Sequence, residues 1–483
     1  MASVSPSAFV GKGIQFGTDG WRGIIAADFT FERVGKVAAI AAQVLEETYG
    51  SNGSKTVIVG YDRRFLSPDF AQYAAECIAA VGYEVKLSEC FAPTPAFSWA
   101  AFDQKALGAI VITASHNPAA YNGLKVKSAF GGSVPPEVTK KIEARLEEAA
   151  PQATNAGSIT AFDPWPSYCS ALQSMVDIEA IRQALDDGKL TIFAEVMHGA
   201  AATGLGRLLQ REINEINSEA DPLFEGGAPE PLPKYIPKLF KAIENKTNDG
   251  LTVGLIFDGD CDRIAGMDGR ANFLSSQVLI PILMEHLTQR RGMTGEVVKT
   301  LSGSNLFLAL AKRYNLPVYE TPIGYKYIAD RMLEAEVLIG GEESGGIGYG
   351  HHIPERDALL SALYALEAVV QSGKDFGELN ESLRQQANFT ADYDRIDLPL
   401  ASMEVRAKLL EALQSSPPTE VAGQQVAHCI TIDGYKLNLV DGSWLLIRFS
   451  GTEPVLRLYS EAADLTRVHE ILAWAKDWAN SVG

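Results

Sequence analysis

Short runs of apolar residues recur along most of the chain, and stretches with a helical spacing of apolar positions separate them. The strand-like runs are residues 56–59, 109–112, 190–194, 253–257, 297–298 and 337–339. The helix-like stretches are residues 34–49, 70–81, 136–149 and 277–290. Strands that are apolar on both faces and alternate with helices are typical of parallel or mixed sheets with helices on both sides. The pattern therefore predicts an α/β protein.

Breaks in this pattern fall near residues 163–166, 268–270 and 385–391. The last hundred residues differ, because apolar and polar positions alternate there, which is typical of strands with one buried face. The alternating segments are residues 394–398, 429–432, 435–439 and 444–449. We therefore expect three α/β domains, at residues 1–165, 166–270 and 271–388, and a smaller α+β domain at 389–483.

Composition narrows the class of protein. The 42 Lys and Arg against 60 Asp and Glu give a formal net charge of −18, which argues against nucleic-acid binding. The five cysteines are scattered and lack CxxC spacing, so we expect reduced thiols in the cytoplasm. The first residues lack the features of a signal peptide, and no apolar run approaches the ~18 residues that span a bilayer. The expectation is a cytoplasmic protein without membrane contact.

A polar cluster, Thr113-Ala114-Ser115-His116-Asn117-Pro118, follows the apolar run at 109–112. Ser, Asn and Pro are also ordinary turn residues, so the cluster has a bland interpretation. The carboxyl end of a strand is, however, where α/β proteins place ligand chemistry. The segment alone leaves both interpretations open.

Three carboxylates alternate in Asp258-Gly259-Asp260-Cys261-Asp262-Arg263, directly after the run at 253–257. In an extended segment they project to one side, and two charges ~4 Å apart repel by about 4 kcal/mol at a dielectric of ~20. A hard divalent cation, Mg²⁺, would relieve this repulsion. An EF-hand is disfavoured because Arg263 stands at position six and Gly269 at position twelve. A solvated acidic turn is the bland alternative.

Two further segments combine glycine with polar side chains. Gly340-Gly341-Glu342-Glu343-Ser344-Gly345-Gly346 carries a carboxylate and a hydroxyl that suit a sugar, although a plain glycine turn fits as well. Arg448-Phe449-Ser450-Gly451-Thr452 and the nearby Arg457 have the chemistry of a phosphate site, although arginines in a surface turn would look similar.

These four segments, in this order, resemble the α-D-phosphohexomutase superfamily, which includes phosphoglucomutase, phosphomannomutase and phosphoglucosamine mutase. Gly17-Thr18-Asp19-Gly20-Trp21-Arg22-Gly23 and Thr321-Pro322-Ile323-Gly324-Tyr325-Lys326 add to the resemblance. It implies three similar domains around a central cleft, with the smaller terminal domain opposite Ser115. It also implies an isomerase that interconverts hexose 1-phosphate and hexose 6-phosphate through a phosphoserine. Glucose is the first expectation for the sugar, with mannose or glucosamine as alternatives.

The resemblance also implies roles for individual residues. The catalytic group comprises Ser115, Lys125, His116 and Arg22. Either Lys125 or His116 could assist proton transfer or charge stabilisation, and we favour Lys125 because Asn122-Gly123-Leu124-Lys125 fits the family pattern NGxK. One Mg²⁺ is held by Asp258, Asp260, Asp262 and the Ser115 oxygen, with Arg263 behind them. The substrate contacts are Gly324, Lys326, Glu342, Ser344, His352, Arg356, Arg448, Ser450, Gly451, Thr452 and Arg457. Hexose 1,6-bisphosphate serves as intermediate and activator, and we expect a monomer or weak homodimer that binds only small hexose phosphates.

Cys261 departs from the family pattern, which has a small Gly or Ala there, and we expect its thiol to be neutral and to point away from the metal. Two rival functions stay open. A phosphatase of the haloacid-dehalogenase type would use Asp258 as nucleophile and leave Ser115 structural. A carbohydrate-binding protein without catalysis would need the sugar and phosphate segments but neither the serine nor the carboxylates.

Overall fold

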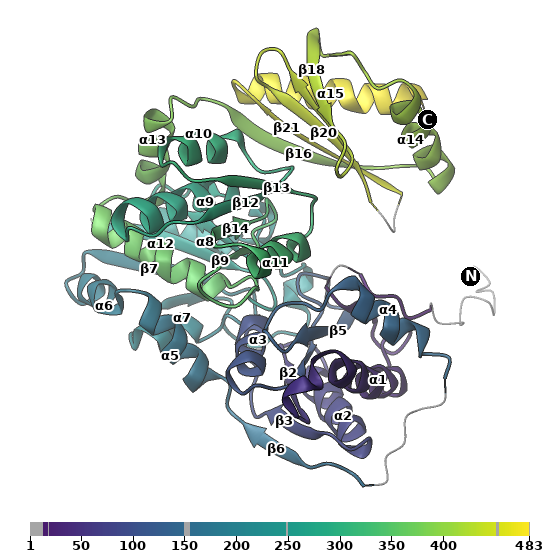
Figure 1. Cartoon of the computed structure of the whole chain (residues 1–483). Coiled ribbons are helices and arrows are strands. Elements are labelled where there is room, and N and C mark those ends of the chain that lie inside the picture. The colour runs from purple at the N-terminus through teal and green to yellow at the C-terminus, as the bar shows by residue number, and fades with distance from the viewer. Residues whose placement is uncertain (1–12, 18, 149–154, 248–249, 451–453, 483) are drawn as a thin grey trace, which may run out of the picture.

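Four β-sheets follow one another along the chain in the computed structural model (Figure 1). The structure describes residues 13–17, 19–148, 155–247, 250–450 and 454–482. Helices cover the first three sheets, and the fourth sheet belongs to a smaller α+β unit, as the sequence predicts. No helix in these ranges is long and apolar enough to cross a membrane.

The first sheet is mixed, with the order β1-β5-β4-β2-β3-β6. Strands β2 and β4 are parallel, and β5 returns antiparallel to β4. The strands are β1 (Trp21–Ile24), β2 (Thr56–Tyr61), β3 (Glu84–Ser88), β4 (Gly108–Ile112), β5 (Tyr121–Ser128) and β6 (Ile159–Phe162). The helices are α1 (Phe31–Tyr49), α2 (Ser67–Ala80), α3 (Thr94–Asp103) and α4 (Pro136–Ala144).

The two faces of this sheet explain its continuous apolar strands. Ile110 and Ile112 of β4 pack in the core that contains α1 and α2, whereas Ala109 and Val111 pack in the core that contains α3. Because successive side chains of a strand point to opposite faces, every position of β4 is buried.

The second and third sheets repeat this arrangement with orders β11-β10-β9-β7-β8 and β13-β12-β14-β15. The second contains β7 (Leu190–Glu195), β8 (Asn214–Ile216), β9 (Leu251–Phe257), β10 (Ile264–Met267) and β11 (Phe273–Leu274), with helices α5 (Trp165–Met175), α6 (Ile178–Asp186), α7 (Gly204–Leu209) and α8 (Pro237–Glu244). The third contains β12 (Glu296–Thr300), β13 (Val318–Thr321), β14 (Val337–Gly341) and β15 (Ile347–Gly348), with helices α9 (Ser276–Glu285), α10 (Asn305–Arg313), α11 (Tyr325–Glu334), α12 (Ala358–Ser372) and α13 (Phe376–Gln386). One continuous apolar core joins these two sheets to one face of the first.

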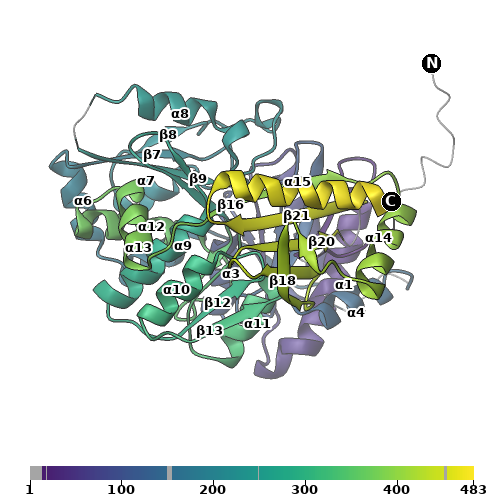
Figure 2. The same cartoon turned by 90° about the horizontal axis from the view of Figure 1, so that it is seen from above.

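The terminal sheet is antiparallel, with the order β16-β21-β20-β19-β18-β17. Its elements are β16 (Asp392–Pro399), α14 (Met403–Ser415), β17 (Glu420–Val421), β18 (Gln424–Ile430), β19 (Tyr435–Leu439), β20 (Trp444–Phe449), β21 (Val455–Ala462) and α15 (Leu465–Val482). Helix α15 packs across β16 and β21 over a core of its own (Figure 2). A small apolar cluster of Leu301, Trp444, Leu446 and Tyr459 joins this unit to the third sheet.

Two expectations about element bounds were wrong. The helix expected at residues 136–149 ends at Ala144, within an acidic and basic stretch that supplies few apolar contacts. The strand expected at 429–432 is β18, which ends at Ile430, and the following residues form the turn to β19.

Candidate functional site

A cleft of about 1920 Å³ runs between the four units, and each unit contributes side chains to its lining. Asp19, Arg22 and His116 come from the first unit, and Arg263 comes from the second. The third contributes Gly324, Lys326, Glu342, Ser344 and Arg356, and the fourth contributes Arg448, Ser450 and Arg457. Most of the residues singled out from the sequence therefore meet in one cavity.

Ser115 lies just beyond β4 and is buried, next to His116, which lines the cleft. Its Oγ donates a hydrogen bond to Asp258 Oδ2 at 3.0 Å and lies 3.3 Å from His116 Nδ1. The backbone of Ser115 is in the left-handed region, with φ 53°. Such a conformation costs about 1–3 kcal/mol in a residue with a side chain, and it persists only where neighbours enforce it.

Arg64, which was not singled out from the sequence, holds much of the Ser115 backbone in this conformation. Its Nη2 donates to the carbonyl oxygens of Ser115 at 2.6 Å and Asn117 at 2.7 Å. Asp62 pairs with Arg64 and accepts a hydrogen bond from Thr113 Oγ1 at 2.6 Å. All of these groups are buried or nearly so. The signal was present in the sequence, because Asp62 and Arg64 follow the apolar strand β2 just as Ser115 follows β4.

The three aspartates after β9 converge on one point, with one oxygen of each within 4.8 Å of the others. Burial and the neighbouring Asp262 and Asp260 raise the pKa of Asp258 well above its usual value. Among the described residues, Asp260 Oδ1 and Asp262 Oδ1 are buried without a hydrogen-bond partner. Three converging buried carboxylates, two of which keep an oxygen without a donor, are the ligand set that a hard cation needs, so these residues fit Mg²⁺.

Close packing brings the aspartate loop (residues 258–263) against the serine loop (residues 113–121). A Cβ on Gly259 would stand 2.4 Å from the carbonyl oxygen of Ser115, so only glycine allows this approach. Cys261 has φ 58°, and its buried side chain packs in the large apolar core. Burial raises the pKa of the thiol well above its usual value, so it is neutral, as expected.

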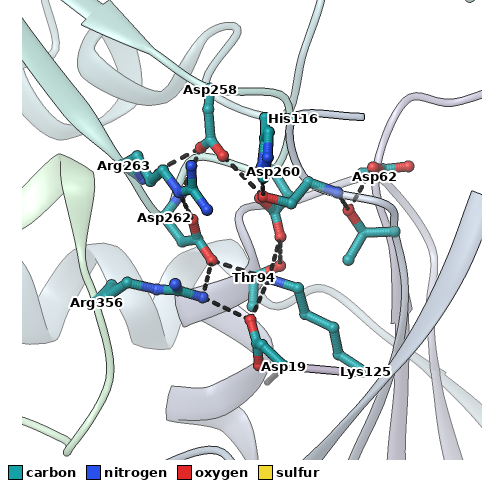
Figure 3. Close-up of polar contacts among 12 residues, drawn as sticks. Asp19, Asp62, Thr94, His116, Lys125, Asp258, Asp260, Asp262, Arg263 and Arg356 are labelled. Atoms are coloured by element: carbon teal, nitrogen blue, oxygen red, sulfur yellow. Dashed lines mark hydrogen bonds and ion pairs between the residues drawn. The ribbon is translucent and has the colours of Figure 1, made fainter. Parts of the chain in front are cut away.

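Two cations stabilise the aspartates from the side (Figure 3). Lys125 Nζ lies 2.8 Å from Asp260 Oδ2, 2.9 Å from Asp262 Oδ2 and 2.7 Å from Asp19 Oδ2. Arg356 Nη2 lies 2.6 Å from Asp262 Oδ2 and 2.5 Å from Asp19 Oδ2. Asp19, which received no role from the sequence, thus joins both cations to the site.

The charges around Lys125 and His116 affect which of the two can transfer a proton. Burial alone would lower the pKa of Lys125, but the three carboxylates around it raise the pKa instead. Of the two roles that the sequence leaves open for Lys125, a lysine held in its charged form suits charge stabilisation better than proton transfer. Burial, with Arg263 and Arg22 nearby, lowers the pKa of His116 well below its usual value, so its imidazole is neutral beside Ser115.

Arg22 and Arg263 line the cleft near this histidine. Arg22 Nη1 donates to Asn117 Oδ1 at 2.5 Å, and burial followed by the nearby Arg263 lowers its pKa. Behind the aspartates, the backbone of Ile264 donates to Gly345 of the predicted sugar segment at 3.0 Å. The aspartate loop and the sugar segment are therefore adjacent.

One expected substrate contact does not reach the cleft. The His352 side chain is fully buried, 3.2 Å from Asp357 Oδ2 through Nε2, and it stacks on Trp99 of α3 with ring centroids 5.4 Å apart. Contact with a sugar phosphate was therefore the wrong role for His352. Packing between the first and third units, which no local pattern reveals, removed it from the surface.

In the terminal unit, Arg448 and Arg457 stand directly opposite each other on β20 and β21. Like charges in directly opposed positions destabilise a sheet unless an anion offsets them. Arg457 Nε is buried without a hydrogen-bond partner within the described ranges. Ser450 N donates to Val455 O at 3.0 Å, and Gly451 and Thr452 lie outside the described residues. The geometry suits an anion such as phosphate.

Four family models match consecutive parts of the chain. They are described as phosphoglucomutase/phosphomannomutase alpha/beta/alpha domain I at residues 13–153, domain II at 166–271, domain III at 275–387 and the C-terminal domain at 403–474.

Full-length relatives point the same way. The phosphoglucosamine/phosphogalactosamine mutase of Sulfurisphaera tokodaii is 30% identical over 462 residues, which cover 94% of this chain and 96% of the relative. The phosphoglucomutase/phosphomannomutase of Thermococcus kodakarensis is 28% identical over 470 residues, covering 95% and 97%. A crystal structure described as a "putative phosphomannomutase" from Thermus thermophilus superposes with a TM-score of 0.83 at 32% identity, covering 98% of this chain and 100% of that one.

Proposed function

Because this chain belongs to the phosphoglucomutase/phosphomannomutase family, we propose that it interconverts hexose 1-phosphates and hexose 6-phosphates through phosphorylated Ser115. One observation supports this most. The Ser115 hydroxyl contacts Asp258 of the aspartate cluster and His116, and His116 lines the same cleft as the paired arginines Arg448 and Arg457. A nucleophile beside the cleft and a separate anion site within it suit a substrate with two phosphorylated positions.

The proposed reaction moves one phosphoryl group at a time. A sugar hydroxyl loses its proton as its oxygen forms a bond to phosphorus, the bond from phosphorus to Ser115 Oγ breaks, and Oγ takes up a proton. The product is a hexose 1,6-bisphosphate, which turns in the cleft and returns its other phosphoryl group to Ser115. The second transfer thus forms a new bond between phosphorus and Ser115 Oγ, which replaces the one that broke in the first transfer.

Individual residues have distinct parts in this scheme. Neutral His116, 3.3 Å from Oγ, is placed to exchange a proton with it. Lys125, Arg22 and Arg263 offset the negative charge that the phosphoryl group brings. Asp258, Asp260 and Asp262 would hold Mg²⁺, which supplies charge stabilisation to phosphoryl oxygens when bound. Arg448 and Arg457 would grip the phosphate that is not transferred and so align the reacting hydroxyl.

The names of the relatives change our view of the sugar. Glucose was the first expectation, but the relatives in sequence and structure are named for glucosamine, galactosamine or mannose as well as glucose. We therefore propose mannose 1-phosphate or glucosamine 1-phosphate as the preferred substrate, with glucose 1-phosphate as a slower one. Glu342 and Ser344, which line the cleft, would contact the sugar hydroxyls or amine.

Phosphorus NMR tests this proposal directly. The protein is incubated with Mg²⁺, a trace of the matching 1,6-bisphosphate and each of the three hexose 1-phosphates in turn. We expect a 6-phosphate signal to replace the 1-phosphate signal, with the highest kcat/KM for the mannose or glucosamine compound. Release of inorganic phosphate without a 6-phosphate product would instead support the phosphatase alternative. The highest kcat/KM for glucose 1-phosphate would refute the proposed sugar preference alone.

A further inference from the structure

A single carboxylate links the arginine pair of the terminal unit to the third unit. Asp433 lies in the turn between β18 and β19, and its Oδ2 accepts a hydrogen bond from Arg448 Nε at 2.9 Å. The same oxygen accepts a hydrogen bond from the backbone N–H of Ile323, also at 2.9 Å. Ile323 begins the cleft-lining segment that continues through Gly324 to Lys326. One oxygen atom therefore joins two walls of the cleft.

The contact with Asp433 uses Nε of Arg448 and leaves its two Nη nitrogens to other acceptors. A guanidinium has donors along two edges, and Asp433 takes the Nε position. A phosphate can bind bidentately through the two Nη nitrogens while the Nε contact persists. Asp433 also places a negative charge behind Arg448, which reduces its repulsion with Arg457 on the opposite strand.

We propose that Asp433 is a positioning residue that fixes the Arg448 guanidinium for phosphate binding. It holds the guanidinium at a fixed position relative to the segment that begins at Ile323. The proposal rests on the proposed function, in which Arg448 contacts the phosphate that is not transferred. Loss of the Asp433 carboxylate should leave Arg448 mobile and move the phosphate relative to the sugar-contacting segments. Substrate binding and alignment weaken as a result.

A simpler role for Asp433 is to form the turn. Asp-Gly is a favoured pair in tight turns, and Gly434 follows with φ 81°. Asn-Gly is equally favoured, so Asp433→Asn preserves the turn and keeps one oxygen that can accept both hydrogen bonds, while it removes the charge. A role confined to the turn therefore predicts that Asp433→Asn behaves as the wild type.

Other contacts keep the terminal unit docked when Asp433 changes. Lys436 Nζ donates to Leu301 O at 2.8 Å, and the backbone N–H of Asn305 donates to Glu461 Oε1 at 2.9 Å. The Asp433 side chain is itself 23% exposed, so its replacement opens no buried cavity. We expect both Asp433 variants to fold.

The test is a double-mutant cycle between Asp433→Ala and Arg448→Ala, read as kcat and KM for the hexose 1-phosphate that turns over fastest. We expect Asp433→Ala to lower kcat/KM about 10-fold, mostly through KM, and Asp433→Asn about 3-fold. In the Arg448→Ala background, Asp433→Ala should change kcat/KM less than about 2-fold, because the group that it positions is gone. Asp477→Ala, at an exposed site on α15, is the matched control and should leave both constants unchanged.

Each outcome separates this inference from the proposed function. An equal effect of Asp433→Ala in both backgrounds would show that Asp433 acts independently of Arg448 and would overturn the inference. Wild-type constants for Asp433→Ala together with a large effect of Arg448→Ala would overturn the inference and leave the proposed function intact. Wild-type KM in Arg448→Ala would refute the phosphate role of Arg448 and the inference with it.

Discussion

Replacement of Arg64 by lysine should damage turnover far more than stability. Arg64 holds four carbonyl oxygens of the serine loop, two of them at 2.6 and 2.7 Å, and two at 3.2 Å on Pro118 and Tyr121. Hydrogen bonds to a charged group contribute about 1.5–3 kcal/mol each and do not add fully. A lysine ammonium presents three donors from one point and cannot reproduce the planar fork.

The hydrogen-bond free energy lost in Arg64→Lys can be compared with the backbone strain at Ser115 that these bonds hold in place. Giving up the two short bonds weakens the hold on the loop by about 3 kcal/mol, which matches or exceeds the ~1–3 kcal/mol cost of the left-handed backbone at Ser115. The loop should relax and displace Oγ, and a displacement of about 1 Å lowers the rate by about 100-fold. Lysine still pairs with buried Asp62, so the free energy of unfolding should fall by only about 1–3 kcal/mol.

The assay measures kcat, KM and thermal unfolding for Arg64→Lys beside Arg63→Lys. Arg63 is the matched control, because it donates to Ser218 O at 2.7 Å in the second unit. We expect kcat to fall about 100-fold in Arg64→Lys with KM within about 3-fold, and no comparable fall in Arg63→Lys. A kcat within about 3-fold of wild type in a folded Arg64→Lys protein would refute the idea that Arg64 positions the nucleophile.

Three further predictions concern separate parts of the molecule. Asp260→Asn should raise the Mg²⁺ concentration needed for half-maximal activity at least about 10-fold, and activity that persists unchanged in excess chelator would exclude the metal assignment. Burial raises the pKa of Glu195 to about 7, so its contribution to stability is complete at low pH and is lost as pH rises through about 7. Between about pH 5 and 8, the free energy of unfolding of the wild type should fall by up to about 3 kcal/mol, and that of Glu195→Gln should fall less. The same dependence of unfolding free energy on pH in both proteins would contradict this. His352→Ala should lower the unfolding free energy by about 2–3 kcal/mol and leave KM unchanged, and a selective rise in KM would restore the substrate role that its burial contradicts.

Local pattern was enough to predict the class of fold and the main polar clusters. The largely apolar strands β4, β9 and β14 each end in a polar segment, and both features are short-range. The serine, the three aspartates and the paired arginines could therefore be found without knowledge of which segments are neighbours. Their meeting in one cleft came from the resemblance, since no spacing along the chain indicates it.

The residues that were missed act through contacts distant in sequence. Thr94 Oγ1 donates to Asp260 Oδ2 at 2.6 Å across 166 positions, and Arg64 reaches Ser115 across 51. Nothing beside Thr94 in the sequence shows that an aspartate faces it. His352 was misjudged for the same reason, because Trp99 that covers it lies in another unit. Local chemistry can be read from a motif, whereas the partner that orients or buries it depends on tertiary packing.

The most direct test of the account is to locate the phosphoryl group on the protein. Wild type and Ser115→Ala are incubated with hexose 1,6-bisphosphate and Mg²⁺, their intact masses are measured, and the phosphorylated peptide of the wild type is sequenced. The phosphoserine mechanism predicts one added phosphate on Ser115, resistant to hydroxylamine and transferable to a hexose phosphate. It predicts none on Ser115→Ala, which should lose at least about three decades of turnover. A hydroxylamine-sensitive phosphate on Asp258 that persists in Ser115→Ala would contradict it.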